Sequence, residues 1–171
     1  KFTSKLLNLQ KKYNIYLIGG DISKSKEINL SSTFFGKAKL KYILYQNKCS
    51  INDDIWVTGN LGNSFIGYQI LTNSNLKIEK KKLDIFKNYY LYPEPCMFGN
   101  IVSKYISSAI DISDGFYGDL NKLLNNKYGA KLNIKNIPIS RNLKSLIFNN
   151  KSLSTFNDIL NWGDDYQLIF T

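Results

Sequence analysis

The chain of 171 residues contains no histidine and only two cysteines. A histidine-based catalytic triad is therefore excluded within this stretch. Cys49 and Cys96 are too far apart to give the ligand spacing of a zinc site, so structural zinc is excluded as well. Low cysteine usage is typical of the cytosol, and we expect a cytoplasmic protein. No apolar run is long enough to span a bilayer and no signal-peptide pattern is present, so no membrane partner is expected.

Arginine is also scarce. Arg141 is the only arginine, although the formal net charge is +10. Proteins that read DNA or RNA use arginine forks and stacked aromatic side chains in a recognisable module, and no such module is visible here. AT-rich coding bias explains the many lysines more simply, because the chain is also rich in asparagine, isoleucine and tyrosine. We therefore expect no nucleic-acid partner.

The most informative stretch present is the segment 109–120. Ile110 and Ile112 alternate with polar residues, which predicts a strand, and the apolar stripe that begins at Phe116 predicts a helix. Asp111 and Asp114 flank the turn between them, with Asp114 as the expected N-cap. Carboxylates beside a helix N-terminus, which favours phosphate, fit a shared divalent cation such as Mg²⁺. The alternative is a common strand-to-helix turn in which one aspartate caps the helix and the other is solvated.

The same design recurs near the start of the chain. Residues 15–21 predict a buried strand that runs into Gly19 and Gly20 and ends at Asp21. A second acid at the end of a strand favours a ligand site over a capping role, which remains the alternative. The turn 59–64 could cradle a phosphate, but a tight strand-to-helix corner needs the same glycines and is the preferred interpretation.

The remaining pattern alternates helices with strands, which indicates an α/β or α+β layer architecture. Helices are expected over 3–13, over 96–105 and in parts of 141–160, and another is expected after Ser64 with Phe65, Ile66, Ile70 and Leu71 on its inner face. Residues 79–82 are expected in a solvated helix face or loop. Strands are expected over 28–36, 55–58, 130–134 and 166–171.

Three motifs in this order and spacing are more specific than any one of them: Ile18–Asp21, Asp111–Gly115 and Gly163–Tyr166. Together with the segment Val57–Ser64, they make the chain resemble thiamine-monophosphate kinase. That family belongs to a superfamily of ATP-dependent enzymes that includes aminoimidazole-ribonucleotide and selenophosphate synthetases. The resemblance covers nearly the whole chain. It implies the end of an N-terminal ATP- and Mg-binding domain at 1–38 and a C-terminal domain, with a mixed sheet and helices, at 39–171.

Read through this resemblance, the enzyme transfers the γ-phosphoryl group of ATP to thiamine monophosphate by direct in-line attack, assisted by Mg²⁺. The metal ligands implied are Asp21, Asp111 and Asp114. Contacts to ATP are implied for Gly20, Asp21, Gln46 and Ser113, and contact with the thiamine part of the substrate for Asp164. The resemblance also implies a homodimer, because the N-terminal domains of the family pair.

Some positions depart from the family pattern. Gln46 and Cys96 stand where the family has arginines, Trp162 where it has a glycine, and Gln167 where it has an acid. Gln46 offers no charge for a nucleotide phosphate. Two alternatives therefore stay open: another ATP-dependent enzyme of the same superfamily, and a non-catalytic protein that binds nucleotide or thiamine phosphate.

Overall fold

The computed structural model describes residues 2–73, 78–96, 103–149 and 156–171. The chain divides into two compact units, Lys1–Lys37 and Ala38–Thr171, and each is described by itself. The domain assignment made from the resemblance, 1–38 and 39–171, remains a prediction. Most of the helix predicted at 96–105 lies outside the described residues.

The first unit consists of helix α1 (Phe2–Tyr13) followed by an extended segment. The helix confirms the prediction for 3–13. The strands predicted at 15–21 and 28–36 are wrong, because these residues form neither helix nor strand and their apolar side chains are exposed. Alternating apolar residues become a strand only when another strand supplies hydrogen-bond partners, and no other segment described in this unit does so.

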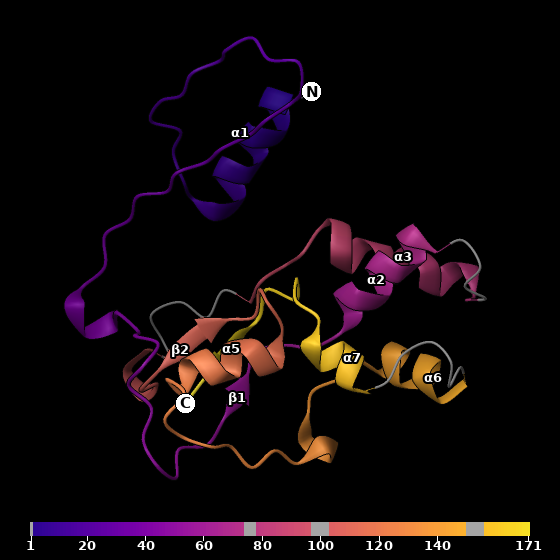
Figure 1. Ribbon diagram of the computed structural model, residues 1–171. Coiled ribbons are helices and arrows are strands. Elements are labelled where there is room, and N and C mark those ends of the chain that lie inside the picture. Colours follow the sequence, from indigo (N-terminus) through magenta and orange to yellow (C-terminus); the bar gives the residue numbers. More distant parts are fainter. Residues whose placement is uncertain (1, 74–77, 97–102, 150–155) are drawn as a thin grey trace. The chain divides into compact units, whose positions relative to one another are not determined.

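The second unit is built on a three-stranded antiparallel sheet with strand order β1–β3–β2 (Figure 1). The strands are β1 (Trp56–Val57), β2 (Ala109–Asp111) and β3 (Leu168–Phe170). In the register, Ile169 of β3 lies opposite Val57 on one side and Ile110 on the other. An isolated parallel bridge joins Tyr45 to Ser108. Because β1 and β2 both run antiparallel to β3, their carboxyl ends lie at the same edge of the sheet.

The helices of this unit lie around the small sheet, and the helix at Phe116–Leu123 packs against β2 and β3 (Figure 1). They are α2 (Asn63–Thr72), α3 (Lys80–Leu91), α5 (Phe116–Leu123), α6 (Arg141–Asn149) and α7 (Phe156–Asn161), with short 3₁₀ turns η1 (Leu40–Tyr42), η2 (Ser103–Tyr105) and η3 (Ile134–Asn136). The α+β class is confirmed. Among the described residues, no helix is both long and apolar enough to cross a membrane.

The strand predicted at 130–134 is wrong. The Asn133 side chain accepts a hydrogen bond from the Lys135 N–H at 3.1 Å, and the chain turns into η3 there. Asparagine side chains compete in this way with the hydrogen bonds of a sheet.

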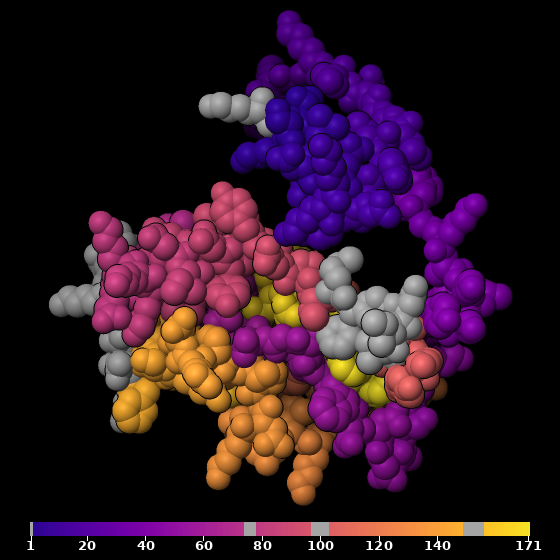
Figure 2. Space-filling view, turned by 180° about the vertical axis from the view of Figure 1, so that it is seen from behind, coloured from indigo at the N-terminus to yellow at the C-terminus, as the bar shows by residue number. Residues whose placement is uncertain are grey.

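One apolar core holds the second unit together. Its fully buried members come from every layer and include Leu61, Ile66, Phe86, Ile112, Leu123, Leu143, Ile159, Leu160 and Ile169. The segment around α6, orange in Figure 2, lies against the α2–α3 pair on the face shown there. A hydrogen bond of 2.7 Å from the Ser140 hydroxyl to Asn63 Oδ1 joins the two at the start of α2. The first turn of α2 is therefore fixed by neighbours distant in the sequence.

Candidate functional site

Two of the three predicted acidic motifs meet at the edge of the sheet where β1 and β2 end. The Asp164 N–H donates to the Ser113 carbonyl at 3.1 Å, and the Tyr166 N–H donates to the Ile112 carbonyl at 2.9 Å. The Ile112 N–H donates to the Gln167 carbonyl at 2.7 Å. These backbone bonds join the Asp111–Gly115 turn to the Gly163–Tyr166 turn, although about fifty residues separate them in the sequence.

The contact between the two turns is so close that it requires glycine. A Cβ atom on Gly163 would lie 1.9 Å from the Ser113 carbonyl oxygen, so a larger residue would force the backbone of one turn to shift. Gly115 has φ +120°, and a Cβ atom there would lie 2.5 Å from the Asn161 carbonyl oxygen. The glycines of both motifs therefore serve the packing of one turn on the other.

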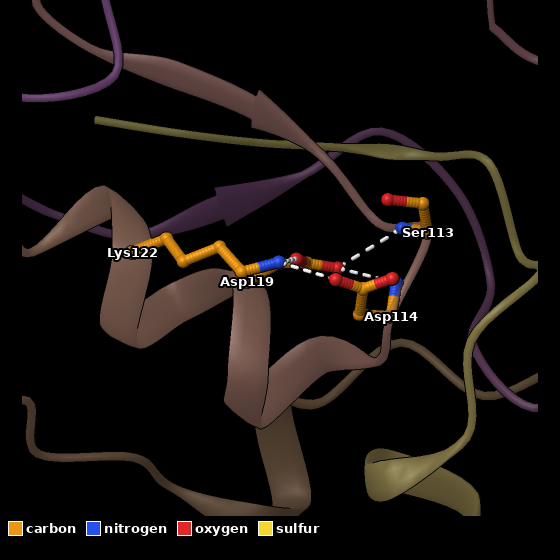
Figure 3. A network of polar contacts seen from close by, with 4 residues as sticks. All are labelled: Ser113, Asp114, Asp119 and Lys122. Atoms are coloured by element: carbon orange, nitrogen blue, oxygen red, sulfur yellow. Dashed lines mark hydrogen bonds and ion pairs between the residues drawn. The ribbon is translucent and has the colours of Figure 1, made fainter.

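The turn after β2 is closed by a residue that the sequence analysis did not assign. Asp119 is fully buried on α5, and its Oδ2 accepts the N–H groups of Ser113 at 3.0 Å and Asp114 at 2.9 Å (Figure 3). The prediction that Asp114 caps α5 is wrong, because the cap position is Gly115 and no side chain bonds there. Asp119 stabilises the turn from within the helix, which leaves the Asp114 carboxylate exposed at the edge.

Asp114 and Asp119 share one cation. Lys122 Nζ lies 2.5 Å from Asp114 Oδ2 and 2.8 Å from Asp119 Oδ1 (Figure 3). Hydrogen bonding to Asp114, and then to Asp119, raises the pKa of the Lys122 ammonium above its ordinary value. The ammonium therefore stays charged and partly neutralises the acidic turn. The Ser113 hydroxyl takes no part in these bonds.

A cavity of about 710 Å³ opens beside the Gly163–Tyr166 turn. Asp164, Asp165 and Gln167 lie on one side, and α3 and the residues after it supply Tyr89, Tyr92 and Glu94 among others. The chain entering α2 adds Asn60, Asn63 and Ser64. A smaller hollow is lined by Asp111, Tyr166 and Cys96 together with Pro93, Pro95 and Leu168. Carboxylates, amides and phenol rings in one cavity suit a polar ligand with an aromatic part.

Asp165 is the most perturbed acid of the cavity. Its Oδ2 accepts the Gly62 N–H at 2.9 Å, and its Oδ1 accepts the Ser64 hydroxyl at 2.8 Å. Burial raises the pKa of the Asp165 carboxyl to about 6, although the hydrogen bonds from Gly62 and Ser64 oppose the rise. The charge of neighbouring Asp164 adds to it. Loss of contact with water therefore raises the pKa of this carboxyl by more than its hydrogen bonds lower it.

The turn on either side of Asp165 is strained. Asp164 has φ 61° and Tyr166 has φ 49°, in the left-handed region that a bulky residue such as tyrosine rarely adopts. The Tyr166 hydroxyl donates to Asp164 Oδ1 at 3.1 Å, which raises the pKa of the phenol. Strain of this kind costs about 1–3 kcal/mol for each residue and is concentrated at binding sites.

The other predicted residues are placed as follows. Gln46 is exposed, next to the bridge residue Tyr45, and Cys96 lines the same hollow as Asp111. Gly20 and Asp21 lie in the extended segment of the first unit, where both are exposed. Within the ranges that the structure describes, no group of three or more acids, cysteines or histidines could hold a metal ion. The assignment of Asp21, Asp111 and Asp114 as metal ligands therefore remains a prediction.

The fold and the cavity define a protein of the α+β class with two joined acidic turns beside a polar cavity at the end of its sheet. No family model matches the chain. The thiamine-monophosphate kinase of Buchnera aphidicola from Acyrthosiphon pisum is 37% identical over 177 aligned residues, which cover 100% of this chain and 52% of the relative. The chain spans about half the length of the curated relatives it matches.

Solved structures of thiamine-monophosphate kinases are also similar to this chain. The crystal structure of thiamine-monophosphate kinase from Aquifex aeolicus matches with a TM-score of 0.62 and 27% identity, over 74% of this chain and 44% of that one. A structure described as AaThiL complexed with AMPPCP and TMP matches with a TM-score of 0.57 and 26% identity, over 74% and 41%. The predicted resemblance to thiamine-monophosphate kinase is thereby confirmed over nearly the whole chain.

Proposed function

We propose that this chain is part of an ATP-dependent enzyme that phosphorylates thiamine monophosphate to thiamine diphosphate. The observation that carries the proposal is the joining of the two acidic turns, Asp111–Gly115 and Gly163–Tyr166, beside a cavity with polar and aromatic walls. The sequence relatives are named as thiamine-monophosphate kinases, and one structural relative was solved with AMPPCP and TMP, which are an ATP analogue and the acceptor in this reading.

The proposal includes Mg²⁺, which would enter the site bound to ATP. Asp111 and Asp114 offer exposed carboxylates near the carboxyl end of β2, and Asp21 is the third metal ligand that the resemblance implies. Mg²⁺ is usually held by one or two carboxylates, with water and phosphate oxygens completing its shell, so two acids on one turn fit a shared site. When bound, Mg²⁺ would supply neutralisation of the phosphate charge.

The chain's own residues then position the two substrates. Asp164, at the edge of the cavity, would hold the thiamine part of the acceptor, while Gly20, Asp21, Gln46 and Ser113 would contact ATP. Phosphoryl transfer needs alignment and charge stabilisation more than covalent chemistry, so direct in-line attack by the acceptor phosphate requires no nucleophilic side chain. The domain assignment made above and the homodimer are parts of the same proposal.

A non-catalytic binding protein is the second candidate. Cys96 lines the hollow beside Asp111, where the resemblance implies an arginine, and the exposed Gln46 replaces the other arginine. Neither side chain can offer the bidentate, permanently charged contact of a guanidinium to phosphate. Such a protein would bind nucleotide and thiamine monophosphate without transfer.

The test uses the complete gene product with ATP, Mg²⁺ and thiamine monophosphate, and follows thiamine diphosphate by chromatography. We expect product formation, and a fall of about 100-fold or more in kcat for Asp111→Asn, since the amide loses the charge that a metal ligand needs. Asp54→Asn, in an exposed loop before β1, is the matched control and should keep normal turnover. Calorimetric binding without any product would favour the binding protein, and equal turnover of both variants would contradict the role of Asp111.

A further inference from the structure

Helix α2 begins without a cap of its own. Its N-cap position is Gly62, which has no side chain to accept the free N–H groups of the first turn, and no hydrogen bond of that kind is present there. The φ of +80° and the Ile159 methyl group 2.1 Å from a Cβ placed on Gly62 show why only glycine fits. The missing acceptor therefore has to come from another part of the chain.

Asp165 supplies that acceptor from about a hundred residues away. Its Oδ2 accepts the Gly62 N–H at 2.9 Å, and its Oδ1 accepts the Ser64 hydroxyl at 2.8 Å. The Ser64 hydroxyl lies 3.2 Å from the Gly163 carbonyl as well. The Asp165 side chain therefore joins the start of α2 to the Gly163–Tyr166 turn by hydrogen bonds.

We infer that Asp165 is a positioning residue, which caps α2 and so holds Asp164 in its left-handed conformation at the wall of the cavity. Asp164 and Tyr166 flank Asp165 and are the two strained residues of the turn. A strained backbone conformation persists only where the surrounding structure holds it, and the hydrogen bonds of Asp165 with Gly62 and Ser64 do so here. This inference rests on the proposed function, in which Asp164 holds the thiamine part of the acceptor.

The hydrogen bonds make Asp165→Asn a conservative variant. Its amide oxygen can accept the Gly62 N–H, and its NH₂ group can donate to the Ser64 hydroxyl. That hydroxyl is then free to donate to the Gly163 carbonyl. Asp165→Ala removes every acceptor and releases the turn. A positioning role is therefore rescued by asparagine, whereas a direct charge contact with the ligand is lost in both variants.

The experiment measures kcat, the KM for thiamine monophosphate and calorimetric binding of thiamine monophosphate, all on the complete gene product. We expect Asp165→Ala to raise the KM about tenfold and to change kcat less than threefold, because the substrate loses a preorganised contact. Asp165→Asn should return the KM to within about threefold of the parent. In an Asp164→Asn background, Asp165→Ala should add no further loss of binding, because the effect passes through Asp164.

The control is Ile70→Val, which weakens the buried face of the same helix away from its first turn. It should lower the melting temperature and leave the KM unchanged. An unchanged KM in Asp165→Ala, or equal losses in the alanine and asparagine variants, overturns the positioning role while the proposed function stands. A parent protein that neither binds thiamine monophosphate nor forms product overturns the proposed function, and the inference with it.

Discussion

The half-buried carboxylate of Asp165 makes the stability of the second unit depend on pH. Its pKa is about 6 in the folded protein, against an ordinary value of 3.8 that applies when the chain is unfolded. The folded state therefore holds this proton more tightly. The stabilisation that the protonated form provides is fully present below about pH 4 and is lost as the pH rises through about 6.

The size of the effect follows from the two pKa values. A difference between 3.8 and about 6 corresponds to about 3 kcal/mol, at 1.36 kcal/mol for each factor of ten in proton affinity. Asp165→Asn resembles the protonated form, because it is uncharged and keeps the same hydrogen-bonding shape. We expect the unfolding free energy of the variant, minus that of the parent, to increase by about 2–3 kcal/mol between pH 4.0 and pH 7.5.

Urea unfolding of both proteins at these two pH values measures this difference. Trp162 is a suitable fluorescent probe, because its ring lies 4.6 Å from Tyr68 and 5.2 Å from Phe65 within the fold. The pH dependence that the parent and the variant share cancels in the comparison. A difference that stays constant with pH, or that falls as the pH rises, would refute the conclusion that burial dominates the environment of Asp165.

Two substitutions test how the acidic turns are held. Gly163→Ala should cost about 1–3 kcal/mol in urea unfolding, because its methyl group would lie against the Ser113 carbonyl oxygen, and an unchanged midpoint would contradict the close approach. Asp119→Ala should cost a similar amount, about 1–3 kcal/mol, since the two backbone N–H groups of the turn lose their acceptor. Lys122→Met is the comparison for Asp119→Ala and should cost less, because Asp119 Oδ2 still accepts both backbone N–H groups and the ammonium that is lost is half exposed.

The strand, turn and helix over 109–124 could be predicted because their pattern is local. Ile110 and Ile112 alternate over a few residues, and the stripe from Phe116 recurs at helical spacing. The strands predicted at 15–21 and 28–36 failed for the opposite reason. Alternating apolar residues form a strand only when a second strand pairs with their backbone N–H and C=O groups, and the described part of the first unit provides none.

The sequence singled out several acids of the two joined turns, but it did not show which of them bind backbone groups and which are exposed. The strand-and-turn pattern selected Asp111 and Asp114, and the resemblance selected Asp164, yet Asp119 closes the turn that Asp114 was expected to cap. The task of Asp165 could not be read from its neighbours, because both of its partners lie at the start of α2. A glycine at the start of the helix was the available signal, since it leaves the first turn in need of an acceptor from elsewhere.

The acids of the two turns fall into two groups, and substitutions in the two groups should have different effects on the fold. The acids that hold the backbone, Asp119 and Asp165, have their oxygens engaged with N–H and hydroxyl groups. The exposed Asp111 and Asp114 lie on the same turn with carboxylates that serve no backbone group in the hydrogen bonds observed. A substitution at Asp111 is therefore expected to alter ligand chemistry while the turn stays closed, whereas one at Asp119 opens the turn first. A measurement of unfolding stability should therefore distinguish the two cases: a substitution at Asp111 lowers activity without lowering stability, whereas one at Asp119 lowers both.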